Sequence, residues 1–274
     1  MPAPNAITPD KLARLVASAS GPRIVDLRDG PTEAIPGSLF PTHPDPTGWG
    51  YAAGSSAVLV DADGSGPAVA AAAILRSEGV AAEALDGGFT AWTASALPTV
   101  SLAHLPPRHE DGRTWWVTRA RPKVDRIACP WLIRRFVDPE ARFLFVAPGE
   151  VLTVATQQQA EPFDVADDGV FWSHRGERCT FDVMVEAFGL EAHEPLVRLA
   201  AIVRGADTDR LDLAPEAAGL LAISLGLSRI HSDDHAQLEA GMAVYDALYR
   251  WCRDAQGEKH NWSSHQPARG KVSA

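Results

Sequence analysis

The sequence contains few cysteines and no long uninterrupted run of apolar residues. Its three cysteines, Cys129, Cys179 and Cys252, are an odd number at wide spacing, which argues against a disulfide scaffold and fits a reducing compartment. No apolar stretch reaches the roughly 20 residues that a membrane-spanning helix needs. The N-terminal segment also lacks the basic start and apolar run of a secretory signal. We therefore expect a cytoplasmic protein with no membrane partner.

Positive charge is scarce as well. Lys and Arg number 25 against 35 Asp and Glu, so the formal net charge is -10. Because phosphate binding depends mainly on Lys and Arg, this balance argues against nucleic acid as a partner. The sequence also contains no Walker loop, Rossmann glycine fingerprint, CxxC pair, HExxH helix or serine nucleophile elbow, which excludes the enzyme classes built on those motifs.

The 274 residues have an ordinary globular composition, with 46% hydrophobic residues, and this length favours two compact units. Residues 98–112 carry three prolines and no apolar periodicity, which is typical of a linker. We therefore predict one domain over residues 1–105 and a second over 106–254. Residues 255–274 form a polar tail that we expect to be flexible.

The first part alternates strand and helix patterns. Residues 23–28 and 57–60 are apolar strand candidates, and a glycine-rich turn followed by an alanine-rich helix over 67–77 comes after the second of them. This rhythm predicts an α/β fold with a parallel sheet and flanking helices.

The second part begins with strand patterns and ends with helix patterns. Strands are expected at 114–118, 142–146 and 171–174, and helices at 125–137, 180–188, 194–204, 215–230 and 234–253. The predicted fold of this part is α+β with a helical C-terminal half.

Four segments of the first part carry a family resemblance: Ile24–Arg28, Ile35–Ser38, the strand, loop and helix over 57–79, and Gly87–Trp92. In their order and spacing, residues 7–99 resemble the rhodanese family. The resemblance implies a catalytic cysteine in the loop after the central strand, where backbone N–H groups stabilise a thiolate or persulfide. Here Ala62 stands at that position, so sulfurtransferase activity is not expected.

The altered loop, Asp61–Pro67, has two interpretations. The first part could be a scaffold that offers a surface for a homodimer or a protein partner. Alternatively, the carboxylates of Asp61 and Asp63 could bind another ligand, although Asp and Gly are expected in a tight loop for turn geometry alone.

The second part carries longer and more unusual strings, which are residues 116–138, 171–182, 202–208, 216–226 and 233–239. Residues 114–254 resemble the C-terminal domain of chromate resistance protein B. The resemblance implies a chromate-resistance-associated protein that binds or senses a small oxyanion such as chromate. That family acts in part through an N-terminal half that binds DNA. The present N-terminal half shows no helix-turn-helix or basic recognition helix, which argues against direct transcriptional control.

A cationic cluster stands between a predicted strand and the start of a helix: Arg119, Arg121, Lys123 and Arg126. Helix N-terminal N–H groups and guanidinium donors match tetrahedral oxyanions well. We predict oxyanion binding by Arg119, Lys123 and Arg126. The alternative interpretation is a solvated or salt-bridged surface.

A second polar cluster has the spacing His-x-x-Glu-x-Cys-x-x-Asp, comprising His174, Glu177, Cys179 and Asp182. A helix N-terminus and a nearby imidazole lower the pKa of a thiol, so Cys179 is a candidate thiolate for metal or redox chemistry. We predict a divalent transition metal on His174, Glu177 and Cys179, with Asp125, Cys129 or Asp182 as possible additional ligands.

Two other interpretations of this cluster remain open. It could form the centre of a metal- or thiol-dependent redox enzyme at His174 and Cys179. Alternatively, Cys179 is a small buried hydrophobe, and Glu177 and Asp182 satisfy donors at a helix start.

Acidic residues also gather at the borders of the last helices: Asp207, Asp209 and Asp212, and then Asp233 and Asp234 beside His235. Acids are common helix caps, so we interpret Asp234 and His235, which open the final helix, as structural.

Overall fold

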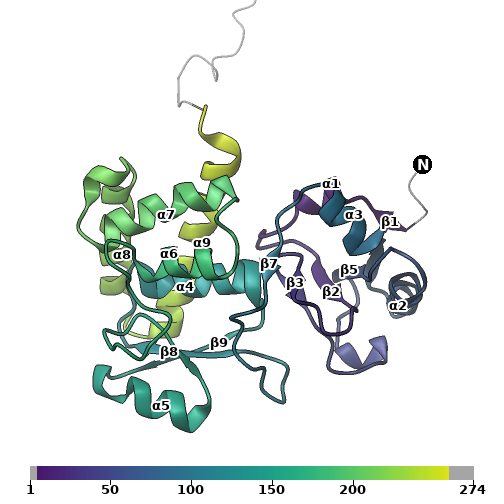
Figure 1. The fold of residues 1–274 in the computed structure, drawn as a ribbon, viewed down its shortest axis with the longest axis horizontal. Coiled ribbons are helices and arrows are strands. Elements are labelled where there is room, and N and C mark those ends of the chain that lie inside the picture. The colour runs from purple at the N-terminus through teal and green to yellow at the C-terminus, as the bar shows by residue number, and fades with distance from the viewer. Residues whose placement is uncertain (1–4, 259–274) are drawn as a thin grey trace, which may run out of the picture.

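A parallel sheet organises the first part of the protein. The structure, a computed structural model, describes residues 5–258. The five strands run in the order β1-β6-β5-β2-β4, and every neighbouring pair is parallel. Their bounds are β1 (Ala6–Ile7), β2 (Arg23–Asp26), β4 (Ser38–Leu39), β5 (Ser56–Val60) and β6 (Ala81–Leu85). The α/β fold class expected for this part is therefore confirmed (Figure 1).

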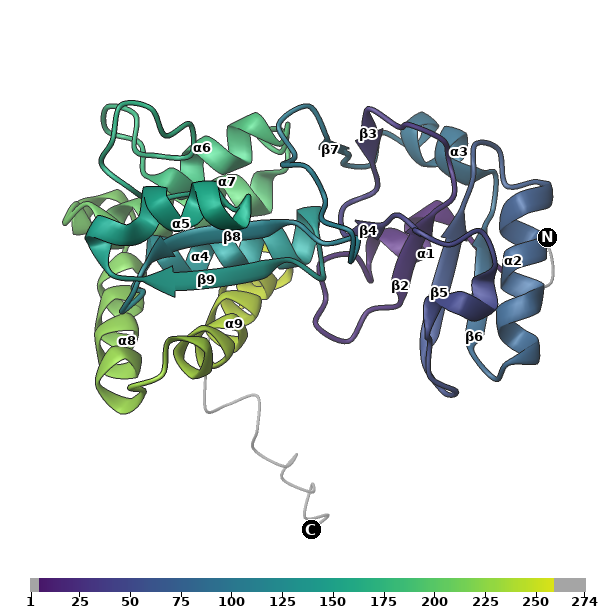
Figure 2. The same cartoon turned by 90° about the horizontal axis from the view of Figure 1, so that it is seen from below.

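Helices cover both faces of this sheet (Figure 2). Leu12 of α1 (Pro9–Ala13) and Trp92 of α3 (Gly88–Ala94) pack with Val58 and Val60 of β5 on one face. The alternate residue Leu59 packs with α2 (Gly66–Ser77) on the other face. The period-two alternation of β5 thus builds two separate cores.

The loop Asp61–Pro67 packs closely against Gly88. A Cβ at Gly88 would lie 2.4 Å from the backbone nitrogen of Gly64, and Gly88 has φ +58°. Both observations require glycine at this position. The composition of the Gly87–Gly88 pair suggests only a turn, but in the structure Gly87 caps α3 and Gly88 is its first residue.

The segment expected to be a linker is anchored to both parts. Its strand β7 (Val100–Ser101) pairs with β3 (Glu33–Ala34) in antiparallel fashion, and Val100 belongs to the core of the second part. Arg108 lies 3.2 Å from the buried carboxylate of Asp138. The domain division at residue 105 stays a prediction.

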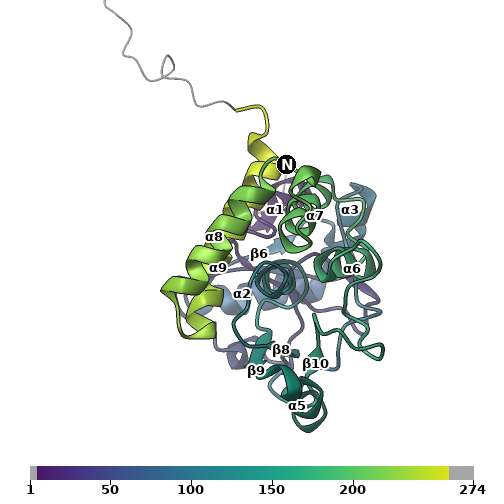
Figure 3. The same ribbon diagram turned by 90° about the vertical axis from the view of Figure 1, so that its left-hand side faces the viewer.

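The second part is built on a small parallel sheet in the order β10-β8-β9. Its strands are β8 (Trp115–Arg119), β9 (Arg142–Val146) and β10 (Glu161–Pro162), and its first helices are α4 (Asp125–Leu132), α5 (Val151–Gln158) and α6 (Thr180–Ala187). The chain continues with α7 (Glu194–Asp207), α8 (Ala217–Ile230) and α9 (Asp234–Arg250), and Figure 3 shows α8 and α9 side by side. The predicted α+β fold with a helical C-terminal half is confirmed.

Helix α4 lies in the middle of the second core. Trp131 has no exposed surface and contacts Phe136, Phe181, Tyr245 and Tyr249. The interior position of α4 buries nearly all of its residues, including Asp125 at its first position.

Two sequence expectations for this part need correction. The strand expected at 171–174 is wrong, because these residues form only one isolated bridge, between Trp172 and Phe163. The sequence patterns did not predict helix α5.

Residues 259–274 of the predicted polar tail lie outside the described residues. Within residues 5–258, none of the helices combines the length and hydropathy that a bilayer crossing requires.

Candidate functional site

One imidazole and three carboxylates meet at the N-terminal end of α4. Nε2 of His174 lies 3.5 Å from Oδ2 of Asp125, 3.4 Å from Oδ1 of Asp164 and 3.2 Å from Oδ2 of Asp207. We call these four residues the acidic centre. Three of them, Asp125, His174 and Asp207, each offer a ligand atom within 4.8 Å of the others, a spacing at which a single metal ion could be held.

Each carboxylate comes from a different segment. Asp125 is the first residue of α4, Asp207 is the last residue of α7, and Asp164 follows β10. The backbone has a positive φ at Val124, the residue before Asp125, and at Asp164 itself, with values of 38° and 52°. A positive φ at a β-branched residue costs free energy, and such strain persists only where surrounding structure enforces it.

Asp125 is fully buried and holds the start of α6. Its Oδ2 accepts the backbone N–H of Thr180 at 2.6 Å, and the N–H of Phe181 lies 3.3 Å from the same carboxylate. Burial raises the pKa of Asp125 to about 7, against the opposing effect of the hydrogen bond from His174. The carboxylate is therefore costly to keep charged without a cation beside it.

Asp164 receives most of the neighbouring positive charge. Arg119 lies 2.9 Å and Arg126 3.2 Å from its Oδ2, and the Thr180 hydroxyl donates to its Oδ1 at 3.2 Å. Burial acts to raise the pKa of Asp164, but hydrogen bonds from His174 and Arg119 outweigh it and lower the pKa. Asp164 is thus an anion at neutral pH.

His174 is the exposed member of the centre, with 40% of its side chain accessible, against 18% for Asp207. Hydrogen bonds to Asp125, Asp164 and Asp207 raise its pKa to about 12. An imidazolium here supplies the positive charge that three adjacent carboxylates require. A bound metal ion would supply the same charge, and His174 would then be a neutral ligand.

The structure brings some of the predicted metal ligands together and not others. Asp125 and His174 lie together, whereas Glu177 is 91% exposed and its carboxylate lies 3.8 Å from Arg210. Glu177 is therefore a solvent-exposed carboxylate beside Arg210 and is not among the residues whose ligand atoms converge.

The two cysteines predicted near this site are buried. The thiol of Cys179 lies 3.3 Å from Asp182, which also accepts the Cys179 backbone N–H, and Asp182 pairs with Arg204. Burial raises the pKa of Cys179 and of Cys129 far above the ordinary thiol value. Both residues are thiols rather than thiolates, which matches the interpretation of Cys179 as a small buried residue at a helix start.

The three predicted oxyanion-binding cations do not converge. Arg119 and Arg126 both form ion pairs with Asp164. Lys123 instead lines a small cavity elsewhere, together with Ile127 and Tyr245. Arg121 bonds to carbonyls at the end of α8. The two sites expected from the sequence are therefore adjacent, since Asp164 contacts both the arginines and His174.

Sequence reasoning did not assign Asp164 or Asp207 to the site. Asp207 carried a signal, since it lies in the 202–208 string that resembles chromate resistance protein B. Asp164 carried none, because its role depends on a turn that no local pattern marks.

Comparison with known proteins places the second part in a family. The model described as "ChrB, C-terminal domain" matches residues 116–252, which is half of the chain. The chain belongs to this family. A relative named Protein ChrB, from Cupriavidus metallidurans, is 36% identical over 149 residues, covering 54% of this chain and 44% of the relative. This ChrB-family chain thus spans less than half the length of that relative.

Solved structures of a sulfurtransferase and of a rhodanese-related protein are similar to the first part of the ChrB-family chain. A thiosulfate sulfurtransferase from Pseudomonas aeruginosa is 27% identical, with a TM-score of 0.30 over 36% of this chain and 19% of its own. A rhodanese-related protein from Thermoplasma volcanium is 16% identical, with a TM-score of 0.31 over 35% of this chain and 98% of its own.

Proposed function

We propose that this protein serves chromate resistance by binding a divalent transition metal at Asp125, His174 and Asp207. The observation that carries the proposal is the convergence of an imidazole nitrogen and two carboxylate oxygens within 4.8 Å of one another. The chromate role rests on the resemblance of residues 114–254 to chromate resistance protein B.

The donor set indicates which metals suit the site. Imidazole favours zinc, iron, copper and nickel, and carboxylates favour harder ions such as manganese, so Mn²⁺, Fe²⁺ and Zn²⁺ are the first candidates. Cys179 is not one of the proposed metal ligands, because its buried thiol donates to Asp182. A thiol-centred redox enzyme therefore has little support, whereas a metal-centred one remains compatible with the site.

Elemental analysis of freshly purified protein tests the proposal, with His174→Ala and Asp207→Asn as site variants. The parent should hold close to one metal ion per chain, and both variants should hold far less. Matched controls are His235→Ala and Asp209→Asn, which change the same residue types outside the acidic centre. A parent that stays metal-free after incubation with Mn²⁺, Fe²⁺ and Zn²⁺ would contradict the proposal.

An oxyanion-binding function is the second candidate, and one observation favours it. The Nε of Arg119 is buried and has no hydrogen-bond partner in the described part of the chain, so it could donate to an anion. Chromate and sulfate binding should be measured on Arg119→Gln, Arg126→Ala and Lys123→Ala. Weaker binding in the two arginine variants, with Lys123→Ala unchanged, would support an anion site at Arg119 and Arg126. Unchanged binding in both arginine variants would contradict it.

For the first part we propose a scaffold role in the cytoplasm, with a surface for a second copy or a protein partner. Ala62 at the cysteine position supports a role without sulfur transfer. Sedimentation velocity on the full chain measures its oligomeric state. A chain that transfers sulfur from thiosulfate to cyanide would refute the scaffold interpretation.

A further inference from the structure

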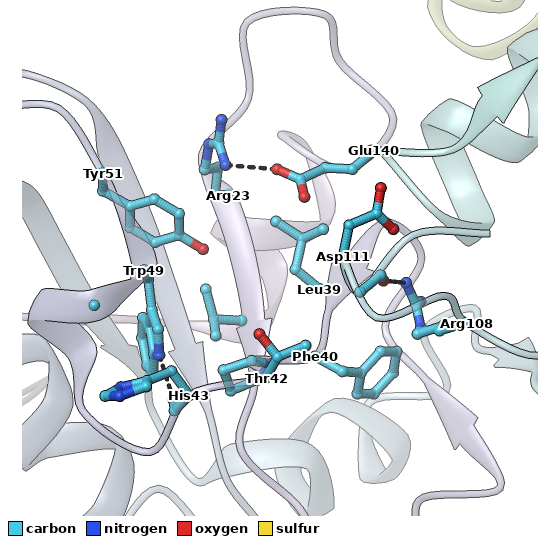
Figure 4. Close-up of a pocket in the computed structure, with 14 residues that line it drawn as sticks. Arg23, Leu39, Phe40, Thr42, His43, Trp49, Tyr51, Arg108, Asp111 and Glu140 are labelled. Carbon is cyan, nitrogen blue, oxygen red and sulfur yellow. Dashed lines mark hydrogen bonds and ion pairs between the residues drawn. The ribbon is translucent and has the colours of Figure 1, made fainter. Parts of the chain in front are cut away.

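A polar cavity lies between the two parts of the protein, and none of the four residues of the acidic centre lines it (Figure 4). Its volume is about 180 Å³. A water molecule occupies roughly 30 Å³ of liquid, so the space corresponds to about six waters or one small organic molecule. The first part contributes Arg23 and Tyr51, and the second contributes Arg108, Asp111 and Glu140.

Donor groups around the cavity have unused hydrogen-bonding capacity. Nη2 of Arg108 is buried and has no partner among residues 5–258. Arg23 uses one guanidinium nitrogen for Glu140, at 3.0 Å, and the rest of the group stays half-exposed over the Tyr51 ring. Burial raises the pKa of Tyr51, which keeps its hydroxyl a neutral donor. The Arg23 guanidinium and the Tyr51 phenol together suit a carboxylate ligand.

Acceptor groups in the same cavity are also incompletely paired. Oδ1 of Asp111 accepts the backbone N–H of Arg113 at 3.1 Å, whereas its Oδ2 lies 3.5 Å from Arg142. The second oxygen of Glu140 lies 3.9 Å from Arg113. The distances to the Arg142 and Arg113 side chains exceed those of a good charge-assisted hydrogen bond, and about a third of each carboxylate side chain is exposed. These oxygens could accept hydrogen bonds from an ammonium group.

The remaining wall is aromatic. Phe40 and Trp49 line the cavity beside Tyr51, and Arg108 lies over the Phe40 ring. In Figure 4 Tyr51 and Asp111 stand on opposite sides of the Arg23–Glu140 pair. Aromatic side chains provide contact area for a small apolar group and attract a cation to their faces.

We propose that this cavity binds a small zwitterion of the size of a free α-amino acid. Its carboxylate would lie against Arg23 and Tyr51, which are neighbours in Figure 4, and its ammonium group against Asp111 and Glu140. A simple anion would meet two carboxylates here, and a simple cation would meet two arginines. A molecule that carries both charges pairs with the cationic and with the anionic side chains of the cavity. We therefore expect the cavity to select zwitterions over simple anions and cations.

Binding would couple the two parts of the chain, because the lining residues come from both. Arg23 opens β2 of the sheet in the first part, whereas Glu140 precedes β9 of the second. A ligand in contact with both would stabilise their contact by mass action.

The test uses the full chain and a panel of the common L-amino acids, with binding followed by thermal shift and isothermal titration calorimetry. At least one amino acid should bind with a dissociation constant below about 10 mM. Its amide, which lacks the carboxylate, and its N-acetyl form, which lacks the ammonium group, should each bind at least about tenfold more weakly.

Variants then locate the binding site. Tyr51→Phe and Asp111→Asn should each weaken binding by about tenfold. The control substitutions Asp10→Asn, in α1, and Arg14→Gln, directly after it, change exposed residues and should leave binding unchanged. The proposal is overturned if no amino acid binds at about 10 mM, if the N-acetyl form binds as tightly as the free amino acid, or if the cavity variants bind like the parent.

Discussion

The carboxylate of Asp61 should stabilise the loop Asp61–Pro67 from within. Only 5% of Asp61 is exposed, and its two oxygens accept the backbone N–H groups of Gly64 at 2.6 Å and Ala68 at 2.9 Å. The second of these N–H groups belongs to the first turn of α2. Asp61 thus fills with its own carboxylate the anion-binding cradle that a loop and a helix N-terminus form.

Replacing Asp61 with Ala would leave both N–H groups without this acceptor. An unsatisfied buried donor costs about 1–3 kcal/mol, and loss of a helix cap costs about 0.5–2 kcal/mol. Because Gly64 is only partly buried and water could reach its N–H group, we expect a total of about 2–4 kcal/mol. Asp61→Asn keeps one acceptor oxygen and should lose about 1–2 kcal/mol.

Hydrogen exchange in a urea series, read on peptides from β5 and α2, measures this loss where it occurs. The control is Asp63→Ala, because Asp63 accepts the Ser65 N–H from an exposed position and should change stability by less than about 1 kcal/mol. A loss for Asp61→Ala no larger than that of the control would refute the reasoning. The loop would then be free to use Asp61 on a ligand.

Three further predictions concern buried residues. Burial, and then the charge of Arg253, lower the pKa of His193 to about 4. In the unfolded state His193 has an ordinary pKa near 6.5, so between pH 6.5 and 4 the unfolded state binds more protons than the folded one. The free energy of unfolding should therefore be up to about 3 kcal/mol higher above pH 6.5 than at pH 4. Denaturant titrations of His193→Gln should lack this pH dependence. Trp131→Ala should lower the unfolding free energy by about 3–5 kcal/mol in the same assay. Gly88→Ala should destabilise the first part by more than about 2 kcal/mol, because its Cβ would collide with Gly64.

Each of these has a contradicting outcome. Equal slopes of stability against pH for parent and His193→Gln between pH 4 and 6.5 would show that the imidazole is solvated. A loss below about 1 kcal/mol for Trp131→Ala would mean that the core collapses around the cavity. Gly219→Ala is the control for Gly88, since Gly219 lies within α8 with open space around it; this change should stabilise the chain by up to about 1 kcal/mol.

Local patterns were enough for most of the helices and for two strands of the first sheet, β2 and β5. The apolar spacing and cap residues of α6 to α9 can be read along the chain, and α9 begins where Asp233 accepts the N–H of Ala236. The strand expected at 171–174 failed because Phe171 and Trp172 pack in aromatic contacts with His104 and with each other instead of pairing in a ladder. Aromatic content favours a strand but does not supply a partner strand.

The sequence by itself determined the α/β and α+β character of the two parts, the absence of a cysteine from the loop Asp61–Pro67 and the family of the second part. These features depend on periodicity, on single residues and on long strings, which are all local. Only the tertiary structure decided which polar side chains form a site. It joined His174 to Asp164 and Asp207, left Glu177 in solvent and buried Cys179. The physical reason is that a site depends on side chains from separate elements meeting in space, and packing sets those distances, whereas sequence spacing sets only those within one element.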